Sequence, residues 1–325
     1  MPITSVDKDV ESLTMTVTAD FSVPVARLWE AYADPRQLEK FWGPQEWPAT
    51  FARHDMFPGG RSAYVMNGPD GESSAGWWEF LSVEPGERFE VLDGFSRPDG
   101  EPDREMPTMR MVFHFEETSV GSRLVIRTVF NSAEELQELL AMGMEEGLRS
   151  AMSQIDAVVA DAESYAPGRR TEVQHLNDTQ VRITRIIRGE LERVWEAQRR
   201  PDLLKRWMLG PEGWTMPVCD VAEEPGDGYR YEWESDDGHQ RFGFAGELRE
   251  SQPPHREVST EQMIGEDGPG TTNELTLTPL GAATLLTLLI TYPDRTMRDT
   301  VLDTGMVDGM EASYARMETE VLTEG

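Results

Sequence analysis

The side chains that could carry metal or nucleophilic chemistry are few and scattered. The five histidines form no close pair and are spread along the chain: His54, His114, His175, His239 and His255. The single cysteine, Cys219, stands outside any CxxC pattern and is expected to pack as a small apolar residue. The sequence also lacks HExxH, GxSxG and the GxxxxGK phosphate loop. We therefore expect no metal and no cofactor.

Acidic side chains in strand-like segments are the remaining candidates for acid–base chemistry. In the segment YEWES, Glu232 and Glu234 flank Trp233, so either the tryptophan or the glutamates face the interior. A buried glutamate with a raised pKa could act as a general acid or base, but the commoner arrangement places the glutamates outside. His114 alternates out of phase with its apolar neighbours and is predicted to face solvent.

Two glycine- and methionine-rich segments point to a different chemistry, the binding of apolar molecules. Gly143 and Gly147 lie four residues apart in a helical pattern, as do Gly305 and Gly309. Glycine inside a helix costs about 0.5–1 kcal/mol relative to alanine, so the pairs need a reason. Methionines beside them suit variable apolar ligands. Two interpretations stay open: the glycines allow close helix-to-sheet packing, or they border a cavity.

Aromatic and methionine side chains of neighbouring segments would complete such a cavity. Trp47 and Trp214 occupy equivalent places in the two halves of the chain, and Tyr64 and Tyr231 do so too. Such residues form protein cores more often than cavity walls. The predicted cavity residues are Trp47, Tyr64, Trp78, Met109, Met111, Phe113, Gly143, Met144, Gly147, Trp214, Tyr231, Trp233, Phe244, Met263, Gly305, Met306, Gly309 and Met310.

The elements that would position these residues follow one order twice. Alternation predicts a strand over 13–21, and i, i+3, i+4, i+7 spacing then predicts a helix from Val25. The first unit continues with a short helix that begins at a proline, a run of strands with glycine turns, and a long helix over 132–162. Ser132 and Glu135 match a capping box at the start of that helix. The second unit has a strand over 179–187, strands between 229 and 292 and a helix over 296–322. Strands segregated from helices indicate an α+β fold.

The chain is an internal repeat. Trp29 and Trp195 lie 166 residues apart within LWEA and VWEA, and Trp47 and Trp214 lie 167 apart within WGPQEW and LGPEGW. Such ordered matches indicate duplication. We predict a first domain over 1–165, a linker over 166–177 and a second domain over 178–325.

Composition excludes several function classes. Acidic residues outnumber basic ones by 60 to 30, a net charge of −30, which disfavours binding to nucleic acid and to anionic membranes. No apolar run approaches the roughly 20 residues of a membrane span. A single cysteine and an opening segment without a basic and apolar leader favour a cytoplasmic location.

The ordered combination of motifs resembles the SRPBCC (START-like, Bet v-like) superfamily, and within it the branch named after the activator of heat-shock-protein-90 ATPase. The matching features are LWEA and VWEA, the proline opening the next helix, WGP and LGP followed by tryptophan, the PGG and PGD turns, and MGMEEG and TGMVDG. The resemblance covers nearly the whole chain, once in each half. It implies two tandem helix-grip domains, each a curved antiparallel sheet wrapped around a long C-terminal helix, with two short helices after the first strand.

Three functions are consistent with this resemblance. The first is binding of a small hydrophobic molecule in a cavity between sheet and C-terminal helix. The second is a cyclase- or hydrolase-type enzyme that uses the same cavity and needs an inward-facing acid, histidine or arginine. The third is an adaptor or co-chaperone-like role with a protein partner, which would use an apolar patch on the outer sheet.

Overall fold

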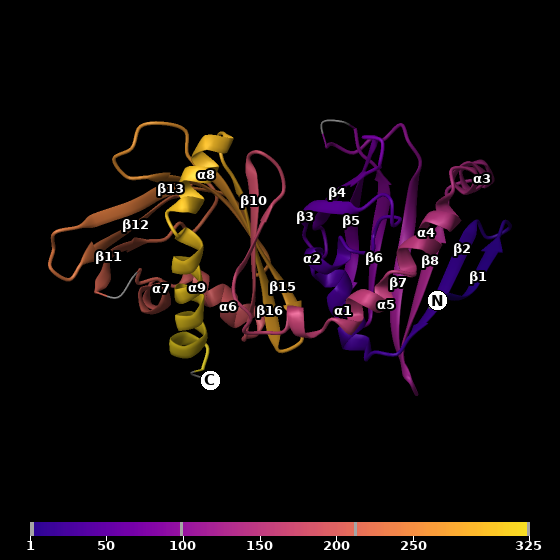
Figure 1. Cartoon of the computed structure of the whole chain (residues 1–325), viewed down its shortest axis with the longest axis horizontal. Coiled ribbons are helices and arrows are strands. Elements are labelled where there is room, and N and C mark those ends of the chain that lie inside the picture. Colours follow the sequence, from indigo (N-terminus) through magenta and orange to yellow (C-terminus); the bar gives the residue numbers. More distant parts are fainter. Residues whose placement is uncertain (1–2, 98–99, 211–212, 324–325) are drawn as a thin grey trace. The chain divides into compact units, whose positions relative to one another are not determined.

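The computed structural model describes residues 3–97, 100–210 and 213–323. The chain divides into two compact units, Met1–Ser164 and Tyr165–Gly325 (Figure 1). Residues 166–177, predicted as a linker, contain strand β9, which pairs with β10 of the second sheet. Pro211 and Glu212 of the LGPEGW motif lie outside the described residues.

The first domain is one antiparallel sheet with helices. Its strands are β1 (Ile3–Asp9), β2 (Thr14–Phe21), β3 (Ala49–His54), β4 (Arg61–Asn67), β5 (Ser73–Glu84), β6 (Arg88–Phe95), β7 (Thr108–Thr118) and β8 (Gly121–Val129). Its helices are α1 (Val25–Ala33), α2 (Pro35–Leu38), α3 (Ala133–Ala141), α4 (Met144–Met152) and α5 (Ile155–Ala160). The strand order β1-β2-β8-β7-β6-β5-β4-β3 places β2 and β3 far apart, so α1 and α2 carry the chain from one side of the sheet to the other.

The second domain repeats this plan. After the short 3₁₀ turn η1 (Glu163–Tyr165), its strands are β9 (Glu172–His175), β10 (Gln180–Ile187), β11 (Trp214–Asp220), β12 (Gly228–Ser235), β13 (Arg241–Gln252), β14 (Arg256–Met263), β15 (Thr271–Leu280) and β16 (Ala283–Thr291). Its helices are α6 (Leu191–Arg199), α7 (Pro201–Trp207), α8 (Arg295–Asp303), α9 (Met306–Arg316) and the π-helical turn η2 (Met317–Val321). The strand order, β11-β12-β13-β14-β15-β16-β10-β9, matches that of the first sheet.

Bulges at matching positions bend both sheets. The register shifts between Phe80 and Ser82 on β5, and between Leu248 and Glu250 on β13. Further shifts lie on β3 and β11. Because a bulge bends its strand and increases the twist, each sheet can curve around its helices. The predicted α+β fold of two tandem helix-grip domains is confirmed.

The single long helix predicted at the end of each domain is interrupted. Gly143 ends α3 and opens α4 with φ of 90°, and Gly305 separates α8 from α9 with φ of 82°. A left-handed backbone conformation favours glycine and closes a helix, so the sequence breaks the helix here. The predicted cap is present: Ser132 Oγ accepts a hydrogen bond from the Glu135 amide, 3.1 Å away.

Candidate ligand-binding site

The inner face of the first sheet is closed by aromatic side chains. Trp78 on β5, Phe89 on β6 and Phe113 on β7 are all 0% exposed. The rings of Phe89 and Phe113 stack with centroids 4.3 Å apart, and Trp42 meets Trp78 edge-on at 4.5 Å. Tyr32 of α1 packs against Phe113 at 5.6 Å. Helix and sheet in this domain are therefore joined through a continuous layer of rings.

The strand registers identify which residue of the second domain takes each of these places. Trp78 pairs with Asp93, and Gly246 pairs with Glu261 at the corresponding point of the second sheet. Among the inward residues, Gly76 of the first domain corresponds to the bulkier Phe244 of the second. Five other pairs, with the first domain's residue named first, are Trp78 and Gly246, Phe89 and Glu257, Val91 and Ser259, Met111 and Asn273, and Phe113 and Leu275. At each of these five places the first domain has the more apolar or bulkier side chain.

The inner face of the second sheet is correspondingly less covered. Tyr231, Phe242, Phe244, Leu275 and Leu288 pack against the core of this domain but remain partly exposed. By contrast, Tyr64, the counterpart of Tyr231, is 7% exposed. Partly exposed apolar side chains that face the helices, rather than bulk solvent, are the side chains that an apolar ligand would contact.

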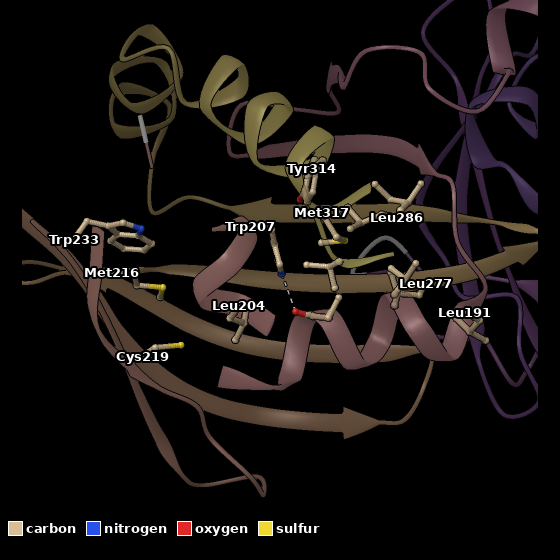
Figure 2. Packing of buried hydrophobic residues seen from close by; sticks show 14 residues of the cluster. Leu191, Leu204, Trp207, Met216, Cys219, Trp233, Leu277, Leu286, Tyr314 and Met317 are labelled. Atoms are coloured by element: carbon tan, nitrogen blue, oxygen red, sulfur yellow. Dashed lines mark hydrogen bonds between the residues drawn. The ribbon is translucent and has the colours of Figure 1, made fainter. Parts of the chain in front are cut away.

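The C-terminal helix closes one end of this inner face. Figure 2 shows Tyr314 and Met317 pointing toward Trp207 and Leu286, all in one buried cluster. The Trp207 indole donates a hydrogen bond to the carbonyl of Ala197 over 2.9 Å. The ring of Trp207 also stacks on Tyr314 with centroids 6.0 Å apart. This packing fixes α7 and the end of α9 against the sheet.

A carboxyl group lies among the aromatic residues of the second domain. Glu261 on β14 accepts a hydrogen bond from the Asn273 amide at 3.2 Å, and the Tyr229 hydroxyl lies 3.3 Å from it. Burial raises the pKa of Glu261, against the lowering effect of these hydrogen bonds. Tyr229 reaches Glu261 across Gly246, where a Cβ atom would lie 2.8 Å from the tyrosine ring. Burial of this kind favours the neutral form of a carboxyl group over its charged form.

A second inward carboxyl group, Glu257, differs because it has a cationic partner. Arg199 of α6 contacts it at 2.6 Å. Burial raises the pKa of Glu257, and the charge of Arg199 opposes that rise. Glu257 is therefore neutralised within the protein, and Glu261 is bound only by uncharged groups in the described part of the chain.

The first domain keeps a carboxyl group at the same place. Asp93 on β6 is 7% exposed and accepts a hydrogen bond from the Trp78 indole at 2.7 Å. The Tyr64 hydroxyl lies 3.4 Å from the same oxygen. Burial raises the pKa of Asp93 to about 7. In this domain the protein's own indole occupies the space next to the carboxyl group.

The predicted glycine strip does not pack against the sheet. A Cβ atom on Gly309 would meet nothing within 4 Å, and one on Gly147 would meet only Pro44, at 4.0 Å. Gly143 and Gly305 serve the helix breaks instead. Close helix-to-sheet packing is therefore the wrong interpretation. The exposed positions of Gly305 and Gly309 also place them away from a buried cavity wall.

The other predicted cavity residues fall into three groups. Buried in the first domain are Tyr64, Trp78, Met109, Met111 and Phe113. Packed into the second core are Trp214, Tyr231, Trp233, Phe244, Met306 and Met310. Partly or largely exposed at the margins are Trp47, Met144 and Met263. The ring of Trp47 lies beside Gly68, and Met263 is 37% exposed.

Several sequence-based expectations about single side chains are confirmed. Trp233 is buried, while Glu232 and Glu234 face outward and pair with Arg230 and Arg241. His114 is exposed beside Glu116, and Cys219 is buried in the second core.

The inward carboxyl groups Asp93, Glu257 and Glu261 were missed. Only Asp93 carried a sequence signal of facing inward, because it continues the alternation of Phe89 and Val91.

Within the described residues, no three potential metal ligands lie together and no helix has the length and apolar character needed to cross a membrane.

Comparison with known proteins gives matches in both halves. The profile of the family described as Activator of Hsp90 ATPase homolog 1-like protein matches residues 22–160 and 189–321. A Mycobacterium smegmatis crystal structure is 48% identical over 48% of this chain and 96% of its own, with a TM-score of 0.46. An Arthrobacter aurescens solution structure is 44% identical over 49% of this chain and 92% of its own, with a TM-score of 0.47. An AHSA1-like protein from Aeromonas hydrophila is 18% identical over 44% and 96%, with a TM-score of 0.37. No curated protein matches the chain.

Proposed function

Because the chain belongs to the Activator of Hsp90 ATPase homolog 1-like family, with one family domain in each half, we propose that it binds a small hydrophobic molecule and that the second domain is the binding half. The ligand would lie between the inner face of the second sheet and α9. The SRPBCC fold commonly binds hydrophobic ligands, which supports a binding site at this inner face.

One observation carries the proposal: at five inward positions the first domain has the bulkier or more apolar side chain. The aromatic and aliphatic side chains that fill the first domain are replaced by Gly246, Glu257, Ser259, Asn273 and Leu275. Apolar neighbours such as Phe242, Phe244 and Leu288 stay partly exposed. An apolar ligand would remove that surface from water, which contributes about 25 cal/mol per Å² buried.

Filling the space tests the proposal. Leu275→Phe installs the residue that the first domain has at this place, Phe113. We expect the affinity for an apolar fluorescent probe to fall about tenfold, which corresponds to about 1.4 kcal/mol. Leu81→Phe is the matched control, because Leu81 is 41% exposed on β5 of the first domain. Unchanged probe affinity in Leu275→Phe, with the fold intact, would rule the site out.

A second candidate, a cyclase- or hydrolase-type enzyme using the same cavity, is favoured by Glu261. Burial raises the pKa of this carboxyl group, and a protonated acid beside a bound substrate can act as a general acid. Hydrolysis of a medium-chain p-nitrophenyl ester that is lost in Glu261→Gln but kept in Glu257→Gln would support this function. Turnover that is the same in both variants would speak against it.

A further inference from the structure

One row across the second sheet combines a carboxyl group with two tyrosines and two small residues. The registers align Tyr229 of β12, Gly246 of β13, Glu261 of β14 and Thr271 of β15, and Tyr292 directly follows β16 where this row continues. The residues on either side of Glu261 are thus a glycine and a threonine, with a tyrosine beyond each. The carboxyl group is flanked by short side chains and bounded by rings.

Two tyrosine hydroxyls near this row have no hydrogen-bond partner within the described residues. Tyr292 is 3% exposed, and its buried hydroxyl is unpaired. The hydroxyl of Tyr231, the next inward residue after Tyr229 on β12, also has no hydrogen-bond partner in the described part of the chain. Burial and, after it, the charge of Glu261 raise the pKa of Tyr292 to about 12, and the charge of Arg298 opposes that rise. An unpaired buried hydroxyl is costly and calls for an explanation.

Glu261 also has no cationic partner in the described part of the chain. Its contacts are the Asn273 amide and the Tyr229 hydroxyl. The Tyr229 hydroxyl lies closer to the carbonyl of Thr260, at 2.9 Å, than to Glu261, at 3.3 Å. Buried carboxylates are normally paired with a cation or fully hydrogen-bonded. Glu257, four residues away on the same strand, meets that expectation through Arg199.

In the first domain a tryptophan fills the equivalent space. There the row is Ser62, Trp78, Asp93 and Met109, continued by Phe130. The Trp78 indole donates its N–H to Asp93 at 2.7 Å. In the second domain glycine stands in place of that tryptophan, so the strong N–H donor to the carboxyl group is missing.

We propose that Glu261, together with the hydroxyls of Tyr231 and Tyr292, binds the protonated amine of a small apolar molecule. An ammonium group has three N–H donors and no acceptor, which matches one carboxylate and two unpaired tyrosine oxygens. Tyrosine ring faces add cation–π attraction. The apolar body of the ligand would lie against Phe242, Phe244 and Leu275. This inference rests on the proposed function of the second domain.

The test compares an amine with an alcohol of the same length on the full chain. We expect n-octylamine to bind about tenfold more tightly than n-octanol, because charge-assisted hydrogen bonds are roughly twice as strong as neutral ones. The net charge of −30 attracts any cation, so both titrations are run at an ionic strength of about 0.5 M, at which surface attraction is screened.

Substitutions identify the carboxyl group. Glu261→Gln keeps an acceptor for Asn273 and should abolish the preference for the amine, while octanol affinity stays. Asp93→Asn in the first domain is the matched control and should keep the preference. Tyr292→Phe should reduce it, because one acceptor is lost. A melting curve on each variant shows that the fold is retained.

The outcomes separate this inference from the proposed function. Equal affinities of octylamine and octanol for the natural protein, or a preference that survives in Glu261→Gln, would overturn the amine site and leave apolar binding standing. If neither compound nor an uncharged apolar dye binds, both proposals fail.

Discussion

In the first domain Phe113 is fully buried under stacked rings; in the second, Leu275 holds the same register position and is partly exposed. The strand order and the bulges of the two sheets match, so the backbone does not account for this contrast. The difference lies in the inward side chains, five of which are bulkier or more apolar in the first domain. The same fold can therefore hold a fully packed inner face or leave apolar side chains of that face partly exposed, depending on the side chains that cover it.

The largest expected effect is a difference in core energetics. Phe113→Ala should lower the free energy of unfolding by about 3–5 kcal/mol, because it opens a cavity in a layer of rings. Leu275→Ala should cost roughly 1–2 kcal/mol, less than the 2–5 kcal/mol of a fully buried leucine, since this side chain is already partly exposed. Guanidinium denaturation measures both. Equal losses at the two positions would contradict the contrast.

The carboxyl group of the first domain should make stability depend on pH. The pKa of Asp93 is raised by burial to about 7 in the folded protein, above about 3.9 in the unfolded chain. A raised carboxyl pKa stabilises the fold fully below the unfolded value, and this contribution is lost as the pH rises toward 7. The free energy of unfolding should change by at most about 1.4 kcal/mol per pH unit through this group.

Asp93→Asn tests this dependence, because it keeps an acceptor for the Trp78 indole but cannot titrate. Denaturation at several pH values between 4 and 8 should show a flatter profile in the variant. The same comparison on Glu261→Gln should show the same direction of change, because burial also raises the pKa of Glu261. A profile that is identical in Asp93→Asn and the natural protein would show that the folded pKa is not raised.

The smallest effects concern the glycines, and here the two domains should agree. Alanine at Gly147 or Gly309 meets nothing closer than 4.0 Å and should stabilise by about 0.5–1 kcal/mol. Alanine at Gly143 or Gly305 must adopt a positive φ and should destabilise by about 1–2 kcal/mol. Thermal unfolding distinguishes the pairs. Effects of the same sign at all four positions would mean that the helix is not broken where the structure breaks it.

The sequence predicted the architecture because its signals were local. Alternation identified β2, and Ser132 and Glu135 identified the start of the final helical segment. The break at Gly143 was misread, because a glycine inside a helical pattern looks the same whether it packs closely or takes a positive φ. The half-exposed edge strand β1 carried no apolar alternation and was not predicted.

The candidate site was harder to predict, because it depends on polar or small residues at positions where a core would have large apolar side chains. On β14 the inward residues are Glu257, Ser259 and Glu261, and the most apolar residue of that segment, Val258, faces the other side. A hydrophobic pattern therefore assigns the wrong face. Only the registers of neighbouring strands place these polar side chains opposite Leu275 and Asn273.

We propose that the second domain holds the binding site and that the inner face of the first domain is filled. Isothermal titration of an uncharged apolar probe into the full chain tests this proposal, since the stoichiometry counts the sites. We expect one probe molecule per chain, lost in Leu275→Phe and kept in Leu81→Phe. Two molecules per chain, or one that remains bound in Leu275→Phe, would contradict it.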